Sequence, residues 1–234
     1  MTLPRRQLLL DIHTSQIPTL DNFVPGGNLE LLDHLDALAD RKDFAALYLW
    51  GPAGCGRSHL LQATARNAAG RRPVTLLNGS QVGSELNAKP GELLIVDDVD
   101  RLSAEAQIAL FRSFNAARLA GLALLLAGPA PALELALRED LRTRIGQCLI
   151  YQVKPLDEEE KAAALARHAA ARNMQLDPAL IQYLLRHGRR DLPSLLAAVD
   201  ALDLASLEQK RPATLPLLRE VLQSRDGGWG MGDG

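Results

Sequence analysis

Several features that mark common protein classes are scarce in this chain. Aromatic residues make up only 4% of the 234 residues, so a core must be built mainly from Leu, Ala, Val and Ile. The abundance of Leu and Ala favours helices. The two cysteines, Cys55 and Cys148, lie in different segments, without a C-x-x-C pair or a histidine at metal-ligand spacing. This usage indicates reduced thiols in a cytoplasmic protein, rather than a disulfide framework or a zinc site.

Neither sign of charge dominates, and apolar runs are short. The 26 Lys and Arg against 28 Asp and Glu give a net charge of -2, so a large nonspecific grip on DNA phosphates is not expected. The apolar run near the N-terminus covers only Leu8–Leu10, and the longest stretch, 119–133, is broken by two glycines and two prolines. We therefore expect neither a signal peptide nor a membrane span.

Short apolar runs alternate with helical patterns over the first two thirds of the chain. Strands are expected over 45–50, 74–77, 92–96, 122–126 and 149–153. Helices are expected over 29–40, 57–69 and 103–120, the first of them capped by Asn28. The alternation predicts an α/β domain in which a parallel five-stranded sheet is flanked by helices.

The pattern changes after Pro155, where no further strand is expected. Four helical segments follow, over 157–172, 177–187, 191–207 and 214–223, and they predict a small all-helical domain. The expected division is an N-terminal arm (1–18), an α/β domain (19–154), a helical domain (155–223) and a glycine-rich tail without fixed structure (224–234).

A glycine-rich loop follows the first predicted strand and leads into a helix. It matches the phosphate-loop spacing G-x-x-x-x-G-K-[ST], except that arginine replaces lysine. Glycines let backbone N–H groups curl around phosphate, and the helix N-terminus adds partial positive charge. The predicted nucleotide-binding residues are Gly51, Pro52, Ala53, Gly54, Cys55, Gly56, Arg57, Ser58 and His59.

Three side chains of this loop have separate expected roles. Arg57 would place its cation at the β-phosphate, and Ser58 would place its hydroxyl on Mg²⁺. Arginine is bulkier and more forked than lysine, so binding can survive the change whereas fast hydrolysis by this chain is not expected. His59 lies inside the first helical turn, where packing or capping is expected rather than catalysis.

Two acids end the strand predicted over 92–96. In phosphate-loop proteins the first such acid, here Asp97, holds the water shell of Mg²⁺. The second, Asp98, would orient the attacking water, although an aspartate reaches less far than a glutamate. The alternative is a strand followed by an ordinary acidic helix cap.

Two arginine-bearing segments are candidates for contact with phosphate. Arg144, in the segment 141–145, could lie at the rim of the α/β domain and stabilise charge on a neighbour's nucleotide. Arg190, in the segment 187–192, could fold back over the phosphates of its own chain. Solvated surface arginines are the alternative in both places.

Taken in order, these motifs resemble the bacterial replication initiator DnaA, a member of the AAA+ proteins. The resemblance begins at Thr19-Leu-Asp-Asn-Phe-Val-Pro-Gly-Gly-Asn28 and continues through both acids to Arg190-Asp-Leu, over residues 19 to about 222. The chain carries no helix-turn-helix segment after residue 222. Its Gly56-Arg-Ser-His-Leu-Leu61 resembles the short DnaA relatives of the Hda type, the regulatory inactivators of DnaA.

The resemblance implies an AAA+ α/β domain with a helical lid, bound ADP or ATP, and Mg²⁺ beside it. It implies docking on the DNA-loaded sliding clamp, the β subunit of DNA polymerase III, and hydrolysis of DnaA-bound ATP promoted by an arginine finger. Arg144 would then be the finger in trans and Arg190 a nucleotide contact in cis. The first sensor position falls near Gly128, where the initiator has a polar residue. The residues expected beside the adenine are Asp21, Asn22, Phe23 and Val24.

The N-terminal arm carries a short clamp-like peptide. Gln7-Leu8-Leu9-Leu10 fits the family's Gln-Leu-x-Leu pattern, but Asp11 stands where the family has proline. Gln7, Leu8 and Leu10 would insert into a pocket of the clamp from an extended arm. A short strand or a loose apolar arm is the alternative.

Two other functions remain open from the sequence. One is a self-sufficient ATPase such as a helicase loader, which the arginine in the phosphate loop disfavours. The other is a DnaA-like DNA-binding adaptor, which the lack of a basic excess disfavours. A homodimer is also open, since no residue specifies it.

Overall fold

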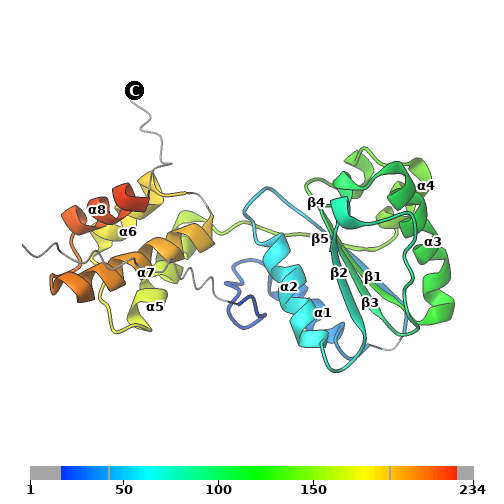
Figure 1. Cartoon of the computed structure of the whole chain (residues 1–234), viewed down its shortest axis with the longest axis horizontal. Coiled ribbons are helices and arrows are strands. Elements are labelled where there is room, and N and C mark those ends of the chain that lie inside the picture. Colours follow the sequence, from blue (N-terminus) through cyan, green and yellow to red (C-terminus); the bar gives the residue numbers. More distant parts are fainter. Residues whose placement is uncertain (1–16, 42, 190, 226–234) are drawn as a thin grey trace, which may run out of the picture. The chain divides into compact units, whose positions relative to one another are not determined.

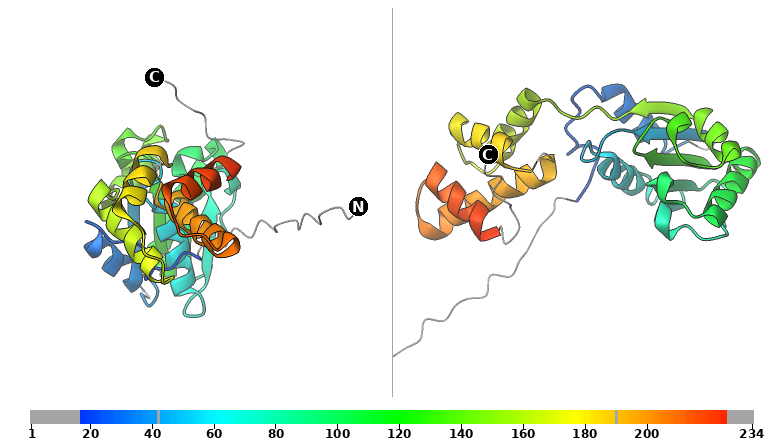
Figure 2. Two further views of the ribbon diagram at one scale, coloured as in Figure 1. Left: turned by 90° about the vertical axis from the view of Figure 1, so that its left-hand side faces the viewer. Right: turned by 90° about the horizontal axis from the view of Figure 1, so that it is seen from above.

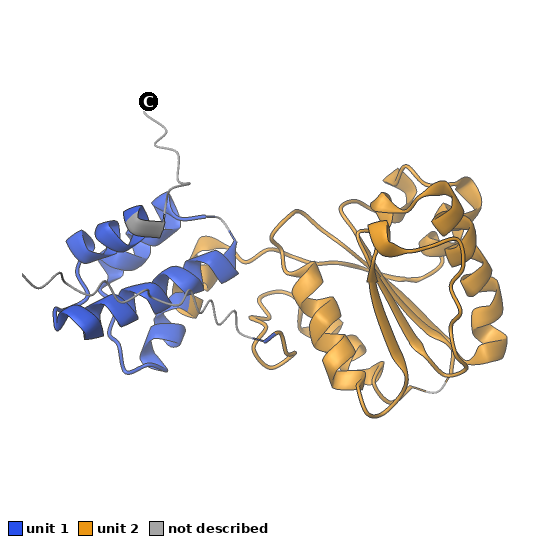
Figure 3. Ribbon diagram, in the orientation of Figure 1, with its two compact units in different colours: residues 1–17, 165–234 blue, residues 18–164 orange. Residues whose placement is uncertain are grey.

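The computed structural model describes residues 17–41, 43–189 and 191–225. These fall into two compact units, one of residues 18–164 and one that begins at Leu165, within helix α5 (Figure 3). None of the helices in these ranges is both long enough and apolar enough to span a membrane.

The first unit contains a five-stranded sheet (Figure 1). The strands are β1 (Ala45–Trp50), β2 (Val74–Asn78), β3 (Leu93–Asp97), β4 (Ala123–Gly128) and β5 (Leu149–Gln152). Their order is β2-β3-β4-β1-β5, and every neighbouring pair is parallel. This confirms the predicted α/β fold and its parallel five-stranded sheet.

Helices cover both faces of this sheet (Figures 1 and 2). They are α1 (Leu29–Ala37), α2 (Arg57–Ala68), α3 (Ala104–Ala120) and α4 (Glu139–Gly146), with 3₁₀ turns η1 (Gly79–Gln81), η2 (Val99–Arg101) and η3 (Ala132–Glu134). Alternate strand residues belong to two separate cores: Leu93 and Ile95 pack with residues of α1 and α2, whereas Leu94 and Val96 pack with residues of α3 and α4. Burial on both faces explains why the inner strands β1, β3 and β4 read as continuous apolar runs.

The strand order brings the loop after β1 and the acids after β3 to one edge of the sheet. Strand β1 lies inside the sheet between β4 and β5, and β3 is the next strand beyond β4. In a parallel sheet all carboxyl ends meet at the same edge, where ligands of such folds bind. The fold therefore places the glycine-rich loop and Asp97 within reach of each other.

The second unit is built from helices. They are α5 (Glu158–Ala170), whose last residues belong to it, α6 (Pro178–His187), α7 (Leu192–Gln209) and α8 (Leu215–Arg225). Asp177 and Asp191 cap α6 and α7 through the backbone N–H groups of Ala179 and Ser194. Buried leucines of these four helices form the core of the second unit. The four helices predicted after Pro155 are confirmed.

Two expectations about local structure differ from the fold. Asn28 occupies the N-cap position of α1, but its side chain makes no cap hydrogen bond, so the predicted capping role is wrong. Its buried amide instead donates to the carbonyls of Pro25 and Lys154, and its Oδ1 accepts from the Lys154 N–H at 2.8 Å. Helix α4 was also not expected as a separate element, because it has only eight residues and ends on Gly146.

Candidate functional site

The loop between β1 and α2 has the backbone that phosphate binding requires. Gly54 and Gly56 have φ values of 78° and 102°, in the region that favours glycine. A Cβ on Gly56 would lie 2.7 Å from Cε2 of Phe23. The loop can therefore keep this tight curve only with glycine at position 56.

Arg57, the first residue of α2, carries an unused donor. Its Nη1 is buried and has no hydrogen-bond partner among the described residues. The guanidinium lies beside the Cys55 thiol, whose pKa is raised by burial and lowered in part by this cation. A buried donor without an acceptor costs free energy, and an anion in the loop would remove that cost. The arginine side chain therefore fits a phosphate oxygen at this position.

The acids after β3 contact the loop residue expected at the metal. The Ser58 hydroxyl donates to Oδ2 of Asp97 at 2.6 Å. No group of three or more His, Cys, Asp or Glu side chains in the described ranges could hold a metal ion by itself. Mg²⁺ at nucleotide sites is held by one or two protein ligands together with substrate phosphates and waters, and Ser58 and Asp97 are of that chemistry. Ser58 and Asp97 are therefore brought together as predicted from the sequence, and their metal role stays a prediction.

Asp98 is held by neighbours rather than left open. Its backbone is in the left-handed region with φ of 50°, and its Oδ2 accepts from the Asn78 side-chain amide at 3.0 Å. Arg101 lies 3.8 Å from the same carboxylate oxygen. Gly79 is required beside it, because a Cβ there would lie 2.2 Å from the Asp98 carbonyl oxygen. The second acid is thus fixed in orientation, and Asn78, which fixes it, was not foreseen from the sequence.

The segment ahead of α1 packs on the start of α2. The Thr19 N–H donates to Asn22 Oδ1, the Asn22 N–H donates to the Thr19 hydroxyl, and the His59 ring bonds to the Thr19 carbonyl at 3.0 Å. Phe23 lies 5.5 Å from the His59 ring centroid. Val24 is half-buried, whereas Asp21 and Asn22 are exposed. The segment predicted to hold the base therefore lies against the phosphate loop.

Burial controls the chemistry of His59. It lowers the pKa of the imidazole from its ordinary value of 6.5, and the hydrogen bond to the Thr19 carbonyl offsets only part of this effect. The neutral ring is the form that the folded chain favours. A packing role for His59, as expected from the sequence, agrees with these contacts.

The end of β4 offers no side chain to a bound nucleotide. Gly128 is buried, and a Cβ there would lie 2.5 Å from the hydroxyl of Tyr48. That hydroxyl donates to the Ala130 carbonyl at 2.6 Å, and burial raises its pKa. Tyr48 of β1 therefore occupies the space that a side chain at position 128 would need.

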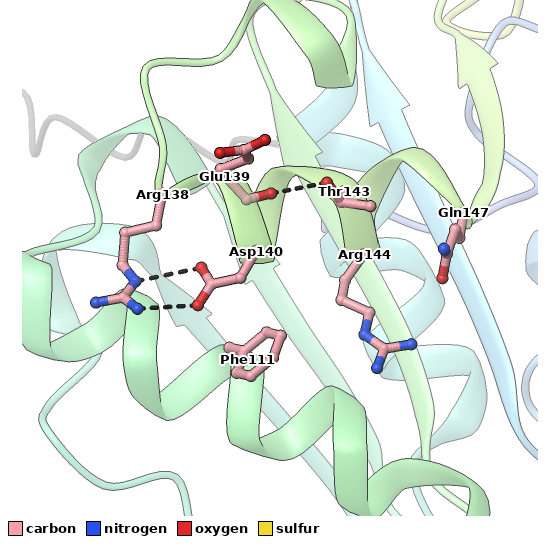
Figure 4. Close-up of a pocket in the computed structure, with 7 residues that line it drawn as sticks. All are labelled: Phe111, Arg138, Glu139, Asp140, Thr143, Arg144 and Gln147. Atoms are coloured by element: carbon pink, nitrogen blue, oxygen red, sulfur yellow. Dashed lines mark hydrogen bonds and ion pairs between the residues drawn. The ribbon is translucent and has the colours of Figure 1, made fainter.

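Arg144 lies on α4 in a different setting, the wall of a shallow groove of 780 Å³ (Figure 4). Its guanidinium is exposed, lies 6.0 Å from the Phe111 ring centroid and donates to Asn115 Oδ1 at 3.0 Å. At the other end of the groove Arg138 forms a two-pronged pair with Asp140. Phe111 and Asn115 of α3 were missed from the sequence, because nothing in their spacing links them to α4.

Four of the predicted site residues lie outside the described part of the chain. These are Arg190 and the clamp-binding residues Gln7, Leu8 and Leu10. The glycine-rich tail over 226–234 lies outside it as well. Their roles stay predictions from the sequence.

Comparisons with known proteins agree with this geometry. Residues 158–222 match the family described as Hda, lid domain. A Haemophilus influenzae protein, itself described only as uncharacterized, is 32% identical over 227 residues, covering 93% of this chain and 98% of the relative.

Solved structures share the fold at lower identity. Domain III of the Thermotoga maritima replication initiation protein DnaA aligns with a TM-score of 0.72 and 19% identity, over 89% of this chain and 97% of that one. A replication initiator DnaA bound to AMPPCP and single-stranded DNA aligns with a TM-score of 0.69 and 21% identity, over 89% and 69% of the two chains.

The parallel sheet, the phosphate-type loop with Asp97 and the fold shared with these neighbours define an AAA+ protein. Within that class the chain is of the Hda type, as the match of residues 158–222 to the Hda lid domain shows. It is therefore a DnaA-related regulator of DNA replication. The resemblance found in the sequence is confirmed.

Proposed function

We propose that this chain holds ADP in its own loop and supplies Arg144 to ATP bound on DnaA. In this mechanism the chain promotes hydrolysis by its partner and so prevents renewed initiation of chromosome replication. Its own site serves as a nucleotide-dependent scaffold. ATP can occupy the same loop, and Mg²⁺ accompanies the nucleotide.

The nucleotide part of the proposal is supported by the fit of the loop. The glycines at 54 and 56 give the backbone its curve, and the buried Nη1 of Arg57 lacks an acceptor within the described ranges. Ser58 and Asp97 would hold Mg²⁺ and its waters, and the segment 21–24 would hold the base. A bound nucleotide supplies the phosphate oxygens that this set of donors lacks.

The finger part is carried by one observation, the state of Arg144. Its guanidinium is exposed on α4, backed by Phe111, and bonded to the neutral amide of Asn115 rather than to a carboxylate. An arginine held this way keeps its charge available for a phosphoryl group of another molecule. Arg138, in the same groove, contrasts with it because Asp140 neutralises its charge.

The clamp part rests on the sequence of the arm. Gln7, Leu8 and Leu10 would bind a pocket of the DNA-loaded sliding clamp in the cytoplasm, which brings the chain to DnaA at active replication forks. Binding through a second module raises the effective concentration of the partners without new contacts between them.

The test is hydrolysis of ATP by purified DnaA in the presence of this protein, ADP and DNA-loaded clamp. Arg144→Ala and Gln7→Ala variants are compared with Gln16→Ala, a glutamine outside the clamp-like peptide. We expect hydrolysis to rise with the intact protein and the control, and to stay at the basal rate with the other two.

Each part fails separately in this assay. Full stimulation by Arg144→Ala would remove the finger assignment. Full stimulation by Gln7→Ala would remove the clamp assignment alone. Turnover of ATP by this protein by itself, with no effect on DnaA, would favour a loader-type ATPase instead.

A further inference from the structure

A second, smaller groove adjoins the one that contains Arg144. It has a volume of 220 Å³ and shares Arg144 and Gln147 with the larger groove. Its other lining residues are the buried or half-buried Phe44, Phe114 and Cys148 and the exposed Asn115 and Arg118. Arg144 and Gln147 therefore lie between the two grooves, and of the two only the larger is lined by carboxylates.

Arg118 is held in a defined position in this groove. It lies in the last turn of α3, where the helix dipole favours a cation. Its Cζ is 5.4 Å from the ring centroid of Phe44, the residue directly before β1. A guanidinium over an aromatic face is attracted to the ring and loses freedom of rotation. Arg118 is thus exposed but oriented, as interface arginines commonly are.

The charge of the smaller groove is uncompensated. Two guanidiniums and two side-chain amides line it, and no carboxylate does. Within the described ranges neither Arg118 nor Arg144 has a carboxylate at ion-pair distance, whereas Arg138 of the larger groove has Asp140. Two like charges on one hollow repel each other in water, and an anion placed between them would relieve that repulsion.

We infer that this groove receives a carboxylate side chain of the partner ATPase, with Arg118 as its ion-pair anchor. The inference rests on the proposed function, because the partner is the molecule whose nucleotide Arg144 reaches. Arg118 would orient docking, so that Arg144 remains free for phosphate.

A carboxylate fits this groove better than a nucleotide does. The volume of 220 Å³ lies below the ~300–1,000 Å³ typical of small-molecule sites. The groove's apolar lining residues are buried or half-buried and its donors are exposed, a combination that suits an aspartate or glutamate with its apolar stem inside. Complementary charge at such a place governs partner choice and association rate.

The experiment measures binding of the full-length protein to DnaA loaded with AMPPCP, so that hydrolysis does not contribute. Arg118→Glu is compared with Arg112→Glu, an exposed arginine of the same helix that lines neither groove. Both variants change the net charge equally. Phe44→Leu tests the ring that orients Arg118, and melting temperature and ADP affinity of every variant report folding.

We expect Arg118→Glu to weaken binding about tenfold or more and to flatten its salt dependence. Arg112→Glu should stay within about twofold of the unmodified protein, as an isolated surface charge does. Phe44→Leu should lie between them. At saturating concentration, ATP hydrolysis by DnaA should be unchanged with Arg118→Glu, in contrast to Arg144→Ala.

A charge exchange identifies the occupant. Asp or Glu to Lys changes on DnaA are tested against Arg118→Glu, and we expect one of them to restore binding. The inference is overturned if no such change restores binding and the affinity depends instead on which nucleotide DnaA carries. It is equally overturned if Arg118→Glu binds like the unmodified protein or no worse than Arg112→Glu. In those cases the proposed function stands, whereas it fails if the unmodified protein neither binds DnaA nor stimulates it.

Discussion

The phosphate-loop corner and the Arg144 surface belong to the same compact unit, yet their polar groups are satisfied in opposite ways. In the corner Ser58, Asp97, Asp98 and Asn78 contact one another, and the donor left over, Arg57 Nη1, is buried. On the surface formed by Arg118, Arg144, Phe44 and Phe111 (the Arg144 surface), both arginines are exposed and lie near an aromatic ring, and neither has a carboxylate at ion-pair distance within the described ranges.

The difference indicates where each ligand comes from. A buried donor without an acceptor is satisfied by a ligand that the chain encloses itself, such as a nucleotide. An exposed cation next to an aromatic ring is solvated, so leaving it without an ion-pair partner costs little free energy. Its interactions become stronger when a partner molecule excludes the water around it. We therefore propose that the corner binds this chain's own nucleotide, whereas the Arg144 surface acts on the nucleotide of a partner.

The largest expected effect comes from removing the finger. Arg144→Ala should lower partner hydrolysis at saturation by about 10³-fold or more, the range seen for arginine fingers, because the guanidinium that would stabilise charge on the transferring phosphoryl group is removed. ADP affinity of the variant should be unchanged, since the corner is untouched. Single-turnover hydrolysis and ADP titration check this. Arg142→Ala, which lines neither groove, is the control, and an equal loss in both variants would count against a special role.

A backbone change should break the corner and spare the surface. Gly56→Ala places a Cβ 2.7 Å from Phe23 in a left-handed conformation, so it should cost about 1–3 kcal/mol and abolish ADP binding. Gly70→Ala has a φ of 85° but no atom within 4 Å of the new Cβ, which makes it the matched control for backbone strain alone. Thermal unfolding and ADP titration check both. ADP binding by Gly56→Ala that matches Gly70→Ala would contradict the loop assignment.

A smaller effect is expected from the hydroxyl of Ser58. Ser58→Ala should weaken binding of ADP about tenfold in Mg²⁺, because the hydroxyl that would ligate the ion is removed. In EDTA the variant and the unmodified protein should bind alike. Titration in both buffers checks this, and a loss that persists without Mg²⁺ would mean that Ser58 acts on the nucleotide directly.

The smallest effect concerns acidity. Burial holds the pKa of His59 below its ordinary value of 6.5, so the unfolded chain takes up a proton that the folded chain resists. Stability should therefore be unaffected above pH 6.5 and should fall as pH drops below it, until the folded-state pKa is passed. Melting temperatures from about pH 7.5 to about pH 5.5 should fall more for the unmodified protein than for His59→Gln. Parallel curves would show that His59 is solvated instead.

Sequence patterns predicted the corner better than the surface, for a physical reason. Gly51–Ser58 is one local motif, and the strand order of a parallel sheet brings Asp97 beside it. Phe111, Asn115 and Arg118 reach their neighbours only through the packing of α3 against α4 and the start of β1, which no spacing in the chain reveals. The predicted capping role of Asn28 was wrong although an asparagine at a helix start commonly caps the helix. Here the side-chain amide of Asn28 is buried and forms hydrogen bonds with the backbone of Lys154 instead.

One measurement tests most directly whether this chain only binds its own nucleotide while it promotes hydrolysis of ATP on DnaA. DnaA is loaded with labelled ATP and mixed with this protein carrying unlabelled ADP and with DNA-loaded clamp, and in a reciprocal arm this protein carries the labelled ATP. We predict that label on DnaA is converted to ADP faster than the basal rate only when the intact protein is present, while label on this protein remains ATP over the same time. Conversion of the label on this protein, with that on DnaA unchanged, would contradict the account.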